Sequence, residues 1–372
     1  MKITYLVHDL GDPAVERRVR MLRAGGGDPI VLGFRRGESA PPEIAGARVV
    51  DLGQTRDSRF VQRIAMVVGA LARPGEILAA AQGSEAIIGR NLETLLLANR
   101  ARRAAPQAKL VYECLDIHRL LLSRSRPARL LQAIEARLLG AVELLLSSSP
   151  AFLRDYFSHR PTLHAPVLLL ENKLLALDGY APQPVPFPDG PPWVIGWFGM
   201  LRCARTFDIL RHLVAKHQGR VRVEIAGRAS PAVFDNFEAQ VAAVPHFRFH
   251  GAYRAEDLPA LYARCHFAWA IDYFEEGLNS RWLLPNRLYE AASFGVVPIA
   301  LESVETGKWL LRHGAGVTLD ADRSSLDSML RSLDTAAYAI LRAQVAEIPR
   351  TDLVAGQADC DVLIAALQTP GR

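Results

Sequence analysis

Short apolar runs alternate with longer segments of helical periodicity along the whole chain. In the first half the apolar runs are 3–7, 29–33, 48–52, 85–88, 110–112, 143–147 and 167–170, and the helical segments are 14–23, 60–72, 92–104 and 127–139. The runs are apolar throughout rather than at every second position, which is typical of parallel strands covered on both faces. Their β-α-β order predicts a doubly wound sheet.

A proline-rich stretch separates this half from the next. Residues 178–193 hold six prolines, so they predict a linker rather than a helix or a central strand. The alternation then restarts, with apolar runs at 194–198, 222–226, 247–250, 267–272, 296–300 and 316–319. With 372 residues, the chain has the length of two domains.

We therefore expect an α/β protein of two Rossmann-like, doubly wound domains that face each other across a cleft. The expected boundaries are 1–173 for the first domain, 174–192 for the linker, 193–340 for the second domain and 341–372 for terminal helices whose packing the sequence does not place. Ligands of such domains bind at the carboxyl ends of the strands.

Composition and charge narrow the functional classes. Half of the residues are hydrophobic and 22% are charged, which is a globular composition. The apolar stretch 64–72 has only nine residues, too short to span a bilayer, and the first strand turns acidic too early for a signal peptide, so we expect a cytoplasmic protein. The four cysteines are scattered without a C-x-x-C pair, which argues against disulfides and clustered zinc.

Positive charge is concentrated in the first half of the chain. Residues 1–172 hold 24 Lys and Arg against 17 Asp and Glu, whereas the remainder hold 20 against 22. This imbalance predicts an anionic partner. Nucleic acid fits poorly, since no aromatic-interleaved basic stripe accompanies the charge. Segment 119–131 mixes leucine clusters with four arginines, as in helices that lie on anionic lipid; leucines facing the core under a polar outer face are the alternative.

The most informative motif is the stretch 285–300, PNRLYEAASFGVVPIA. It predicts a helix that opens at Pro285, ends at Gly295 and leads into a buried strand. Arg287 and Glu290 share one face near the helix N-terminus, where positive charge suits a diphosphate and a carboxylate can accept the hydroxyls of a ribose. An exposed ion pair on a capped helix is the alternative.

This motif resembles the P-x-K-L-x-E-x4-G-x-P signature of GT-B glycosyltransferases, especially the bacterial family-4-like enzymes. Four further segments match that family in order and spacing: 170–172, 196–208, 225–228 and 250–265. The resemblance implies that Glu290 binds the ribose of a nucleotide and that Arg205 and Arg287 hold its diphosphate. It also implies donor-site positions for residues of the matching segments, namely Gly199, Arg228 and Tyr253.

The sequence departs from the family pattern at two places. Met200 stands where members carry an arginine, and Arg202 is the alternative phosphate contact. Trp282 stands where many retaining members carry a glutamate, eight residues before Glu290, and Asn279 and Ser280 are the alternative contacts to the donor sugar. The missing glutamate favours an inverting reaction over a retaining one.

An inverting transfer requires a general base, and the resemblance implies that a carboxylate of the first domain supplies it. The segment YECLDIHR follows a predicted buried strand, and its first candidate base is Asp116, with Glu113 and His118 as alternatives. A carboxylate that caps the turn is the structural alternative. Gly11, in the loop after the first strand, is a candidate phosphate-loop residue or an ordinary turn glycine.

The resemblance implies a hexosyltransferase that moves a sugar from a nucleotide-sugar, expected to be UDP-linked, to an oligosaccharide acceptor. The chain's opening is similar to proteins of succinoglycan-type exopolysaccharide assembly, which implies a polyprenyl-diphosphate-linked acceptor at the inner face of the plasma membrane. The nucleotide-sugar is a substrate, so no cofactor is expected, and arginines replace a metal at the diphosphate. A sugar-nucleotide epimerase of the same fold and a non-catalytic sugar-nucleotide-binding protein are the alternatives.

Overall fold

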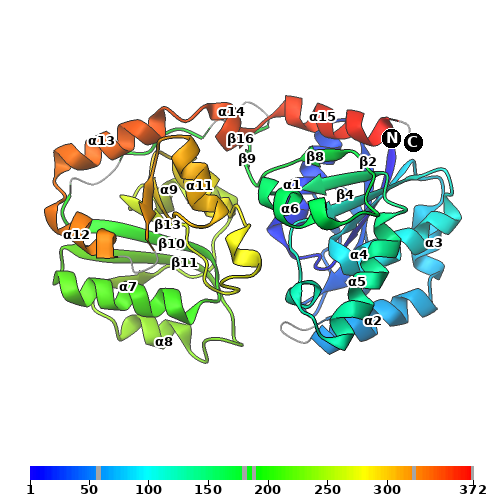
Figure 1. Cartoon of the computed structure of the whole chain (residues 1–372), viewed down its shortest axis with the longest axis horizontal. Helices are drawn as coiled ribbons and strands as arrows, with labels where there is room; N and C mark the ends of the chain where they lie inside the picture. Colours follow the sequence, from blue (N-terminus) through cyan, green and yellow to red (C-terminus); the bar gives the residue numbers. More distant parts are fainter. Residues whose placement is uncertain (56–59, 178–181, 187–189, 321–323, 370–372) are drawn as a thin grey trace. The chain divides into compact units, whose positions relative to one another are not determined.

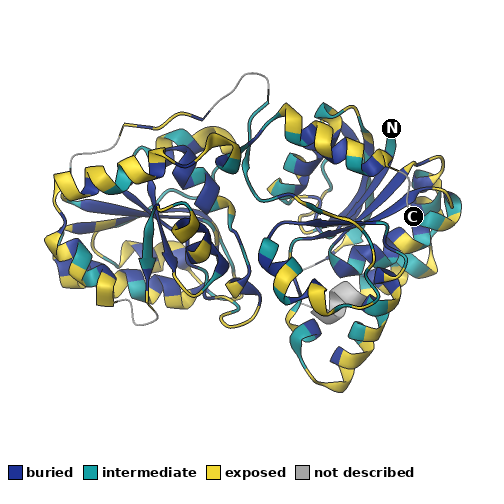
Figure 2. Cartoon of the chain, turned by 45° about the horizontal axis from the view of Figure 1, so that its top comes forward, coloured by how far each residue is buried: buried dark blue, intermediate teal, exposed yellow. Residues whose placement is uncertain are grey.

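The computed structural model describes residues 1–55, 60–177, 182–186, 190–320 and 324–369, and the chain forms two compact units (Figure 1). Unit 1 comprises Met1–Glu171 and Ala355–Arg372, and unit 2 comprises Asn172–Val354. Each unit is a parallel sheet with helices on both faces. The central strands of each sheet are buried, and many exposed residues lie on the outer faces of the helices (Figure 2).

The sheet of unit 1 has the order β3-β4-β2-β1-β5-β6-β7-β8, in which β3 and β4 pair antiparallel and the other pairs are parallel. Its strands are β1 (Lys2–Val7), β2 (Asp28–Arg35), β3 (Glu43–Ile44), β4 (Ala47–Gln54), β5 (Ala86–Arg90), β6 (Lys109–Cys114), β7 (Leu144–Ser147) and β8 (Val167–Leu169). Its helices are α1 (Pro13–Ala24), α2 (Phe60–Ala72), α3 (Gly75–Ala81), α4 (Asn91–Ala101), η1 (Arg102–Ala104), η2 (Arg119–Leu122), α5 (Arg126–Leu139), α6 (Pro150–Asp155), η3 (Phe157–His159) and α15 (Gln357–Gln368).

The end of the chain returns to unit 1. Helix α15 packs on α1 so closely that a Cβ at Gly25 would lie 2.5 Å from the carbonyl oxygen of Cys360. The ammonium group of Lys109 donates to the carbonyl oxygens of Ala366 and Thr369, at 2.7 and 2.5 Å, near the C-terminus of α15. A cation there complements the helix dipole. The terminal segment whose packing the sequence left open is thus divided between the units.

The sheet of unit 2 is parallel, with the order β12-β11-β10-β13-β14-β15. Its strands are β10 (Trp193–Leu201), β11 (Val221–Ala229), β12 (Phe247–Phe249), β13 (Phe267–Trp269), β14 (Val297–Leu301) and β15 (Val317–Leu319), and β9 (Leu174–Leu175) pairs with β16 (Val354–Ala355). Its helices are α7 (Ala204–His217), α8 (Phe237–Ala242), η4 (Ala255–Asp257), α9 (Leu258–Tyr262), η5 (Asn279–Arg281), α10 (Asn286–Ser293), α11 (Glu305–Arg312), α12 (Ser324–Ser332), α13 (Thr335–Ala346) and α14 (Arg350–Leu353).

The predicted linker 174–192 lies within unit 2. Val185, in its described part, is buried, and its amide donates to the carbonyl oxygen of Phe294 at 3.0 Å. Two further parts of the linker, 178–181 and 187–189, lie outside the described residues. Within the predicted linker, Leu174 and Leu175 form β9, whereas the described residues 182–186 form neither helix nor strand and still pack against the unit through Val185.

Candidate functional site

Helix α10 brings Arg287 and Glu290 to one face, as their spacing predicts. Pro285 is the N-cap, in extended conformation, and the helix begins at Asn286. The Arg287 guanidinium donates to the carbonyl oxygen of Ile271 at 2.9 Å, and the Glu290 carboxylate accepts from the hydroxyl of Tyr262 at 3.1 Å. Both side chains are half-buried.

Tyr262 is a support for Glu290 that sequence reasoning missed. It is fully buried, stacks on Phe294 with ring centroids 5.5 Å apart, and meets Phe198 edge-on at 5.1 Å. Burial, and then the Glu290 carboxylate, raise the pKa of Tyr262 far above its usual value, so the hydroxyl keeps its proton and remains a donor. Tyr253 is close by, and burial followed by the Glu290 carboxylate raises its pKa as well.

Arg202 and Arg205 both contact the loop that follows β13. The Arg202 guanidinium lies 3.4 Å from the Asp272 carboxylate and over the ring of Phe274. Arg205 is paired with Glu276 and lies over the ring of Tyr273. These pairs are partly exposed, and exposed ion pairs contribute little to stability. A diphosphate could therefore displace either carboxylate at small cost.

Two glycines shape the ends of β10 and β11. Gly199 has φ +112°, and no atom lies within 4 Å of a Cβ built on it, so the backbone there borders open space. Its partner in register is Gly227, where a Cβ would lie 1.8 Å from the carbonyl oxygen of Gly199. Only glycine fits such an approach. Arg228 follows Gly227 and is exposed.

Asn279 and Ser280 are buried within the loop after β13. They are 3% and 8% exposed, and the Ser280 hydroxyl accepts from the backbone amide of Glu275 at 3.1 Å. This hydrogen bond stabilises the loop 275–280. A sugar contact at either residue stays a prediction.

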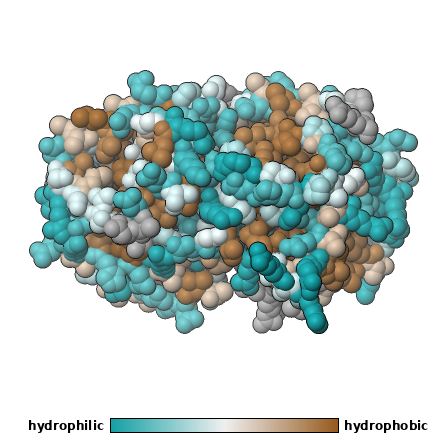
Figure 3. Space-filling view, viewed as in Figure 1, coloured by the Kyte–Doolittle hydropathy of each residue, from teal (hydrophilic) through white to brown (hydrophobic). Residues whose placement is uncertain are grey.

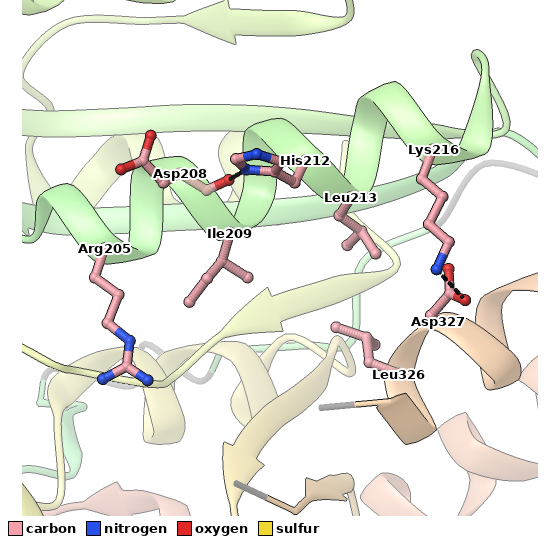
Figure 4. A pocket seen from close by; sticks show the side chains of 8 residues that line it. All are labelled: Arg205, Asp208, Ile209, His212, Leu213, Lys216, Leu326 and Asp327. Carbon is pink, nitrogen blue, oxygen red and sulfur yellow. Dashed lines mark hydrogen bonds and ion pairs between the residues drawn. The ribbon is translucent and has the colours of Figure 1, made fainter. Parts of the chain in front are cut away.

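A hollow of about 570 Å³ lies over α7 and α12 (Figure 4). Its floor carries Ile209, Leu213 and Leu326, and Lys216 pairs with Asp327 at one end. Of the predicted donor residues it includes Arg205, whereas Glu290 and Arg287 are not in its lining. The hollow is therefore separate from the surface around Glu290.

In unit 1, Glu113 lies inside the protein. Its carboxylate is 1% exposed, and it accepts from the Arg18 guanidinium at 2.6 Å and from the Tyr5 hydroxyl at 2.5 Å. The Arg90 guanidinium lies 3.6 Å away. Burial acts to raise the pKa of Glu113, but Arg18 and Arg90 outweigh it and hold the pKa below its usual value. So enclosed a carboxylate is better suited to structure than to proton transfer with an acceptor.

Asp116 lies in the loop after β6 and is exposed, as a base acting on an external hydroxyl must be. His118, two residues later, is the N-cap of η2, and its Nδ1 accepts the backbone amide of Leu120 at 3.3 Å. The lone pair of Nδ1 is therefore engaged within its own turn. Gly11 donates its amide to the Asp9 carboxylate at 2.9 Å, so that amide is engaged within its own turn.

The segment 119–131 becomes η2 and the first half of α5, and its exposed side is basic. Leu121 is buried, Leu130 is 66% exposed, and the exposed arginines are Arg119, Arg124, Arg126 and Arg129. The carboxylate of α5, Glu135, is buried and bonded to Tyr156 and Arg160. Within the part of the chain that is described, no helix combines the length and the apolar character needed to cross a bilayer.

Comparison with known proteins gives relatives over almost the whole chain. The succinoglycan biosynthesis protein ExoL of Rhizobium meliloti (strain 1021) is 42% identical over 378 residues, which cover 99% of this chain and 94% of that protein. None of the protein-family models matches. Among solved structures, sucrose-phosphate synthase of Thermosynechococcus elongatus superposes with a TM-score of 0.70 at 16% identity, covering 99% of this chain and 97% of that chain.

Anabaena HepE in complex with UDP-glucose superposes with a TM-score of 0.69 at 15% identity, covering 98% of both chains. At these identities the two structures establish the fold, and the fold predicted from the sequence is confirmed. The relationship to ExoL is far closer and spans both units. The chain belongs to the family of the succinoglycan biosynthesis protein ExoL and has the GT-B fold.

Proposed function

We propose that the protein transfers a hexose from a UDP-linked sugar to an oligosaccharide acceptor in exopolysaccharide assembly. The observation that carries the donor half is the Glu290 carboxylate, half-buried beside Arg287 and held by Tyr262 at 3.1 Å. The relationship to the succinoglycan biosynthesis protein ExoL supports a role in exopolysaccharide assembly. The UDP-glucose bound in the structure of HepE supports UDP as the nucleotide of the donor.

In this proposal Glu290 accepts the two ribose hydroxyls, and the N-terminus of α10 with Arg287 binds the diphosphate. Arg202 and Arg205 exchange Asp272 and Glu276 for phosphate oxygens when the donor arrives. Four positive groups then balance the leaving diphosphate, so the reaction proceeds without a metal ion and without a cofactor.

Asp116 is the proposed base of an inverting reaction. The acceptor hydroxyl oxygen attacks C1 of the donor sugar while its proton passes to the Asp116 carboxylate. The new C1–O bond forms as the bond from C1 to the diphosphate oxygen breaks, and UDP leaves with that electron pair. The exposure of Asp116 supports this choice over the enclosed Glu113 and over His118.

Calorimetric titration of UDP, GDP, ADP and TDP tests the donor assignment. Wild type should bind UDP most tightly, and Glu290→Ala should weaken UDP binding by about 100-fold, because a charged hydrogen bond contributes about 1.5–3 kcal/mol. Glu302→Ala is the matched control, since Glu302 is an exposed glutamate of the same unit. Equal UDP binding by Glu290→Ala would remove Glu290 from the donor site.

Measurements of turnover distinguish a glycosyltransferase from an epimerase and from a non-catalytic binding protein. UDP release from UDP-glucose, UDP-galactose and UDP-glucuronic acid is followed with and without the lipid-linked oligosaccharides extracted from polymer-producing cells. Acceptor-dependent release that Asp116→Asn abolishes, with UDP affinity retained, supports the proposal. Interconversion of the sugar without acceptor would indicate an epimerase, and binding without either reaction a non-catalytic protein.

We propose further that the acceptor is carried on a polyprenyl diphosphate, and that α5 and η2 rest on the inner face of the plasma membrane while the enzyme works from the cytoplasm. Hydrophilic side chains stand out beside hydrophobic residues in the region of α2 and α5 (Figure 3). Both helices pack on α4, α2 contains no acidic residue, and the acid of α5 points inward. The charge of this surface therefore complements anionic lipid.

Sedimentation with phosphatidylglycerol vesicles tests this contact against phosphatidylcholine vesicles. Reversing two arginines, Arg126→Glu with Arg129→Glu, should reduce binding to the anionic vesicles at least 10-fold, since each arginine contributes about 1 kcal/mol. The control reverses two exposed arginines of unit 2, Arg222→Glu with Arg248→Glu. Equal loss in both double variants would show that net charge, rather than this surface, governs binding.

A further inference from the structure

Asn91 has an unusual backbone conformation at the end of a parallel strand. Its φ is +65°, in the left-handed region, directly after β5 and at the first residue of α4. Other described non-glycine residues with positive φ include Ala45, in the turn between β3 and β4, and Gln218, the C-cap of α7. Those are places where left-handed residues are common. A strand-to-helix junction is not such a place, and a residue other than glycine in this conformation carries backbone strain.

The side chain of Asn91 contacts the loop that holds the proposed base. Its Oδ1 accepts the backbone amide of Leu115 at 3.1 Å, and Leu115 immediately precedes Asp116. Strands β5 and β6 are neighbours in the sheet, with Arg90 opposite Glu113 in register. The hydrogen bond therefore joins the two loops that follow adjacent strands.

A buried charge network holds the strand ends beneath this bond. The Arg90 guanidinium contacts the Tyr5 hydroxyl at 2.9 Å, the Asp12 carboxylate at 3.1 Å and the Glu113 carboxylate at 3.6 Å. Arg18 adds the second cation, so two guanidinium groups face two carboxylates. Arg90, which precedes Asn91, and Glu113, two residues before Leu115, are thus held in place. The hydrogen bond between Asn91 and Leu115 then connects the loop of Asp116 to these anchored strand ends.

We propose that Asn91 is a positioning residue for Asp116: its hydrogen bond to the Leu115 amide fixes the orientation of the Cys114–Leu115 peptide, which leads into Asp116, so that the carboxylate is aligned before the acceptor hydroxyl arrives. The inference rests on the proposed role of Asp116 as base. An alignment error of about 1 Å lowers the rate of such a reaction by up to about 100-fold. In this left-handed conformation the Asn91 side chain reaches the Leu115 amide.

Three substitutions separate the hydrogen bond from the strain. Asn91→Gly relieves the left-handed strain and removes the acceptor, Asn91→Ala removes the acceptor and keeps the strain, and Asn91→Asp keeps both the acceptor and the tolerance of positive φ. UDP release from the UDP-sugar that wild type uses is measured for each, alongside UDP affinity and thermal unfolding.

We expect Asn91→Gly to fold at least as stably as Asn91→Ala, to bind UDP like wild type, and to lose about 10- to 100-fold in kcat with little change in donor KM. Asn91→Asp should recover kcat to within about threefold of wild type. A residue that only supports the fold would instead lose activity in proportion to stability, so the glycine variant would be more active than the alanine variant.

The inference is overturned if Asn91→Gly keeps kcat within twofold of wild type, or if Asn91→Asp is stable yet as slow as the glycine variant. Asp116→Asn, assayed in parallel, identifies which proposal has failed. If it is inactive while Asn91→Gly is normal, the base assignment stands and the positioning role is wrong. If Asp116→Asn turns over like wild type, the base assignment fails and the positioning role fails with it.

Discussion

Glu113 in unit 1 and Glu290 in unit 2 are both glutamates that accept a bond from a tyrosine hydroxyl and lie near arginines, yet their surroundings differ in kind. Glu113 is 1% exposed and is bonded by Tyr5 and Arg18, with Arg90 at 3.6 Å. Glu290 is half-buried and accepts from Tyr262, while the guanidinium of Arg287 is directed to a backbone carbonyl. Charged donors thus enclose Glu113, whereas the more exposed Glu290 is the carboxylate for which we propose a ligand.

The largest effect is expected at Glu113. Glu113→Gln leaves two buried guanidinium groups with one carboxylate fewer, so the free energy of unfolding should fall by about 3–5 kcal/mol. Urea denaturation measures this change. If the variant kept its stability but lost turnover, the structural role of Glu113 would be wrong, because Glu113 would then act in catalysis.

The same network predicts a pH dependence of stability. In the unfolded chain Glu113 titrates near 4.5, and in the folded protein its pKa is lower, so the unfolded state binds more protons between the two values. The stabilisation is present above about pH 4.5 and is lost as the pH falls through the folded pKa. Urea midpoints between pH 6 and 3 should therefore decline less steeply for Glu113→Gln than for wild type.

Glu290→Gln, the same substitution in unit 2, should have the opposite pattern. The amide retains one acceptor oxygen but no charge, so UDP affinity should fall about 10-fold, while the free energy of unfolding stays within about 1 kcal/mol of wild type. Calorimetry and urea denaturation measure the two quantities. Loss of stability without loss of affinity would make Glu290 a second structural carboxylate.

Tyr262→Phe tests whether the hydroxyl that donates to Glu290 supports UDP binding. The ring stays packed on Phe294, but Glu290 loses its hydroxyl donor, so UDP affinity should fall about fivefold for a hydrogen bond of about 1 kcal/mol. Tyr338→Phe is the matched control, because Tyr338 is also buried in unit 2 and donates to the carbonyl oxygen of His266 at 2.9 Å. Equal UDP affinity in both variants would contradict the role of Tyr262.

The smallest effect is expected at Glu276. Glu276→Gln releases Arg205 from an exposed ion pair, which contributes at most about 1 kcal/mol, so UDP affinity should rise about twofold at low salt and less at high salt. Titrations at two ionic strengths measure the change. Weaker UDP binding by this variant would show that Glu276 supports the donor site rather than competing for Arg205.

The order of strands and helices was predictable because it depends on the local spacing of apolar residues and on nearby prolines and glycines. Uniformly apolar runs predicted β1 and β10 to within a few residues, and Pro285 with Gly295 marked the limits of α10. The GT-B prediction from the 285–300 motif is confirmed by the fold and by the ExoL relative. The roles of the individual site residues stay predictions.

Local spacing could not show which polar groups meet. Arg18 and Glu113 are 95 positions apart, Tyr262 and Glu290 are 28 apart, and α15 returns across the length of the chain to Lys109. From sequence alone Asp116 was the first candidate base and Glu113 an alternative, but only the packed structure shows that Glu113 is a buried counter-ion and that Asp116 lies at the surface. A carboxylate's protonation, reach and ligand depend on its desolvation and on the charges around it, and those exist only once distant segments have packed together.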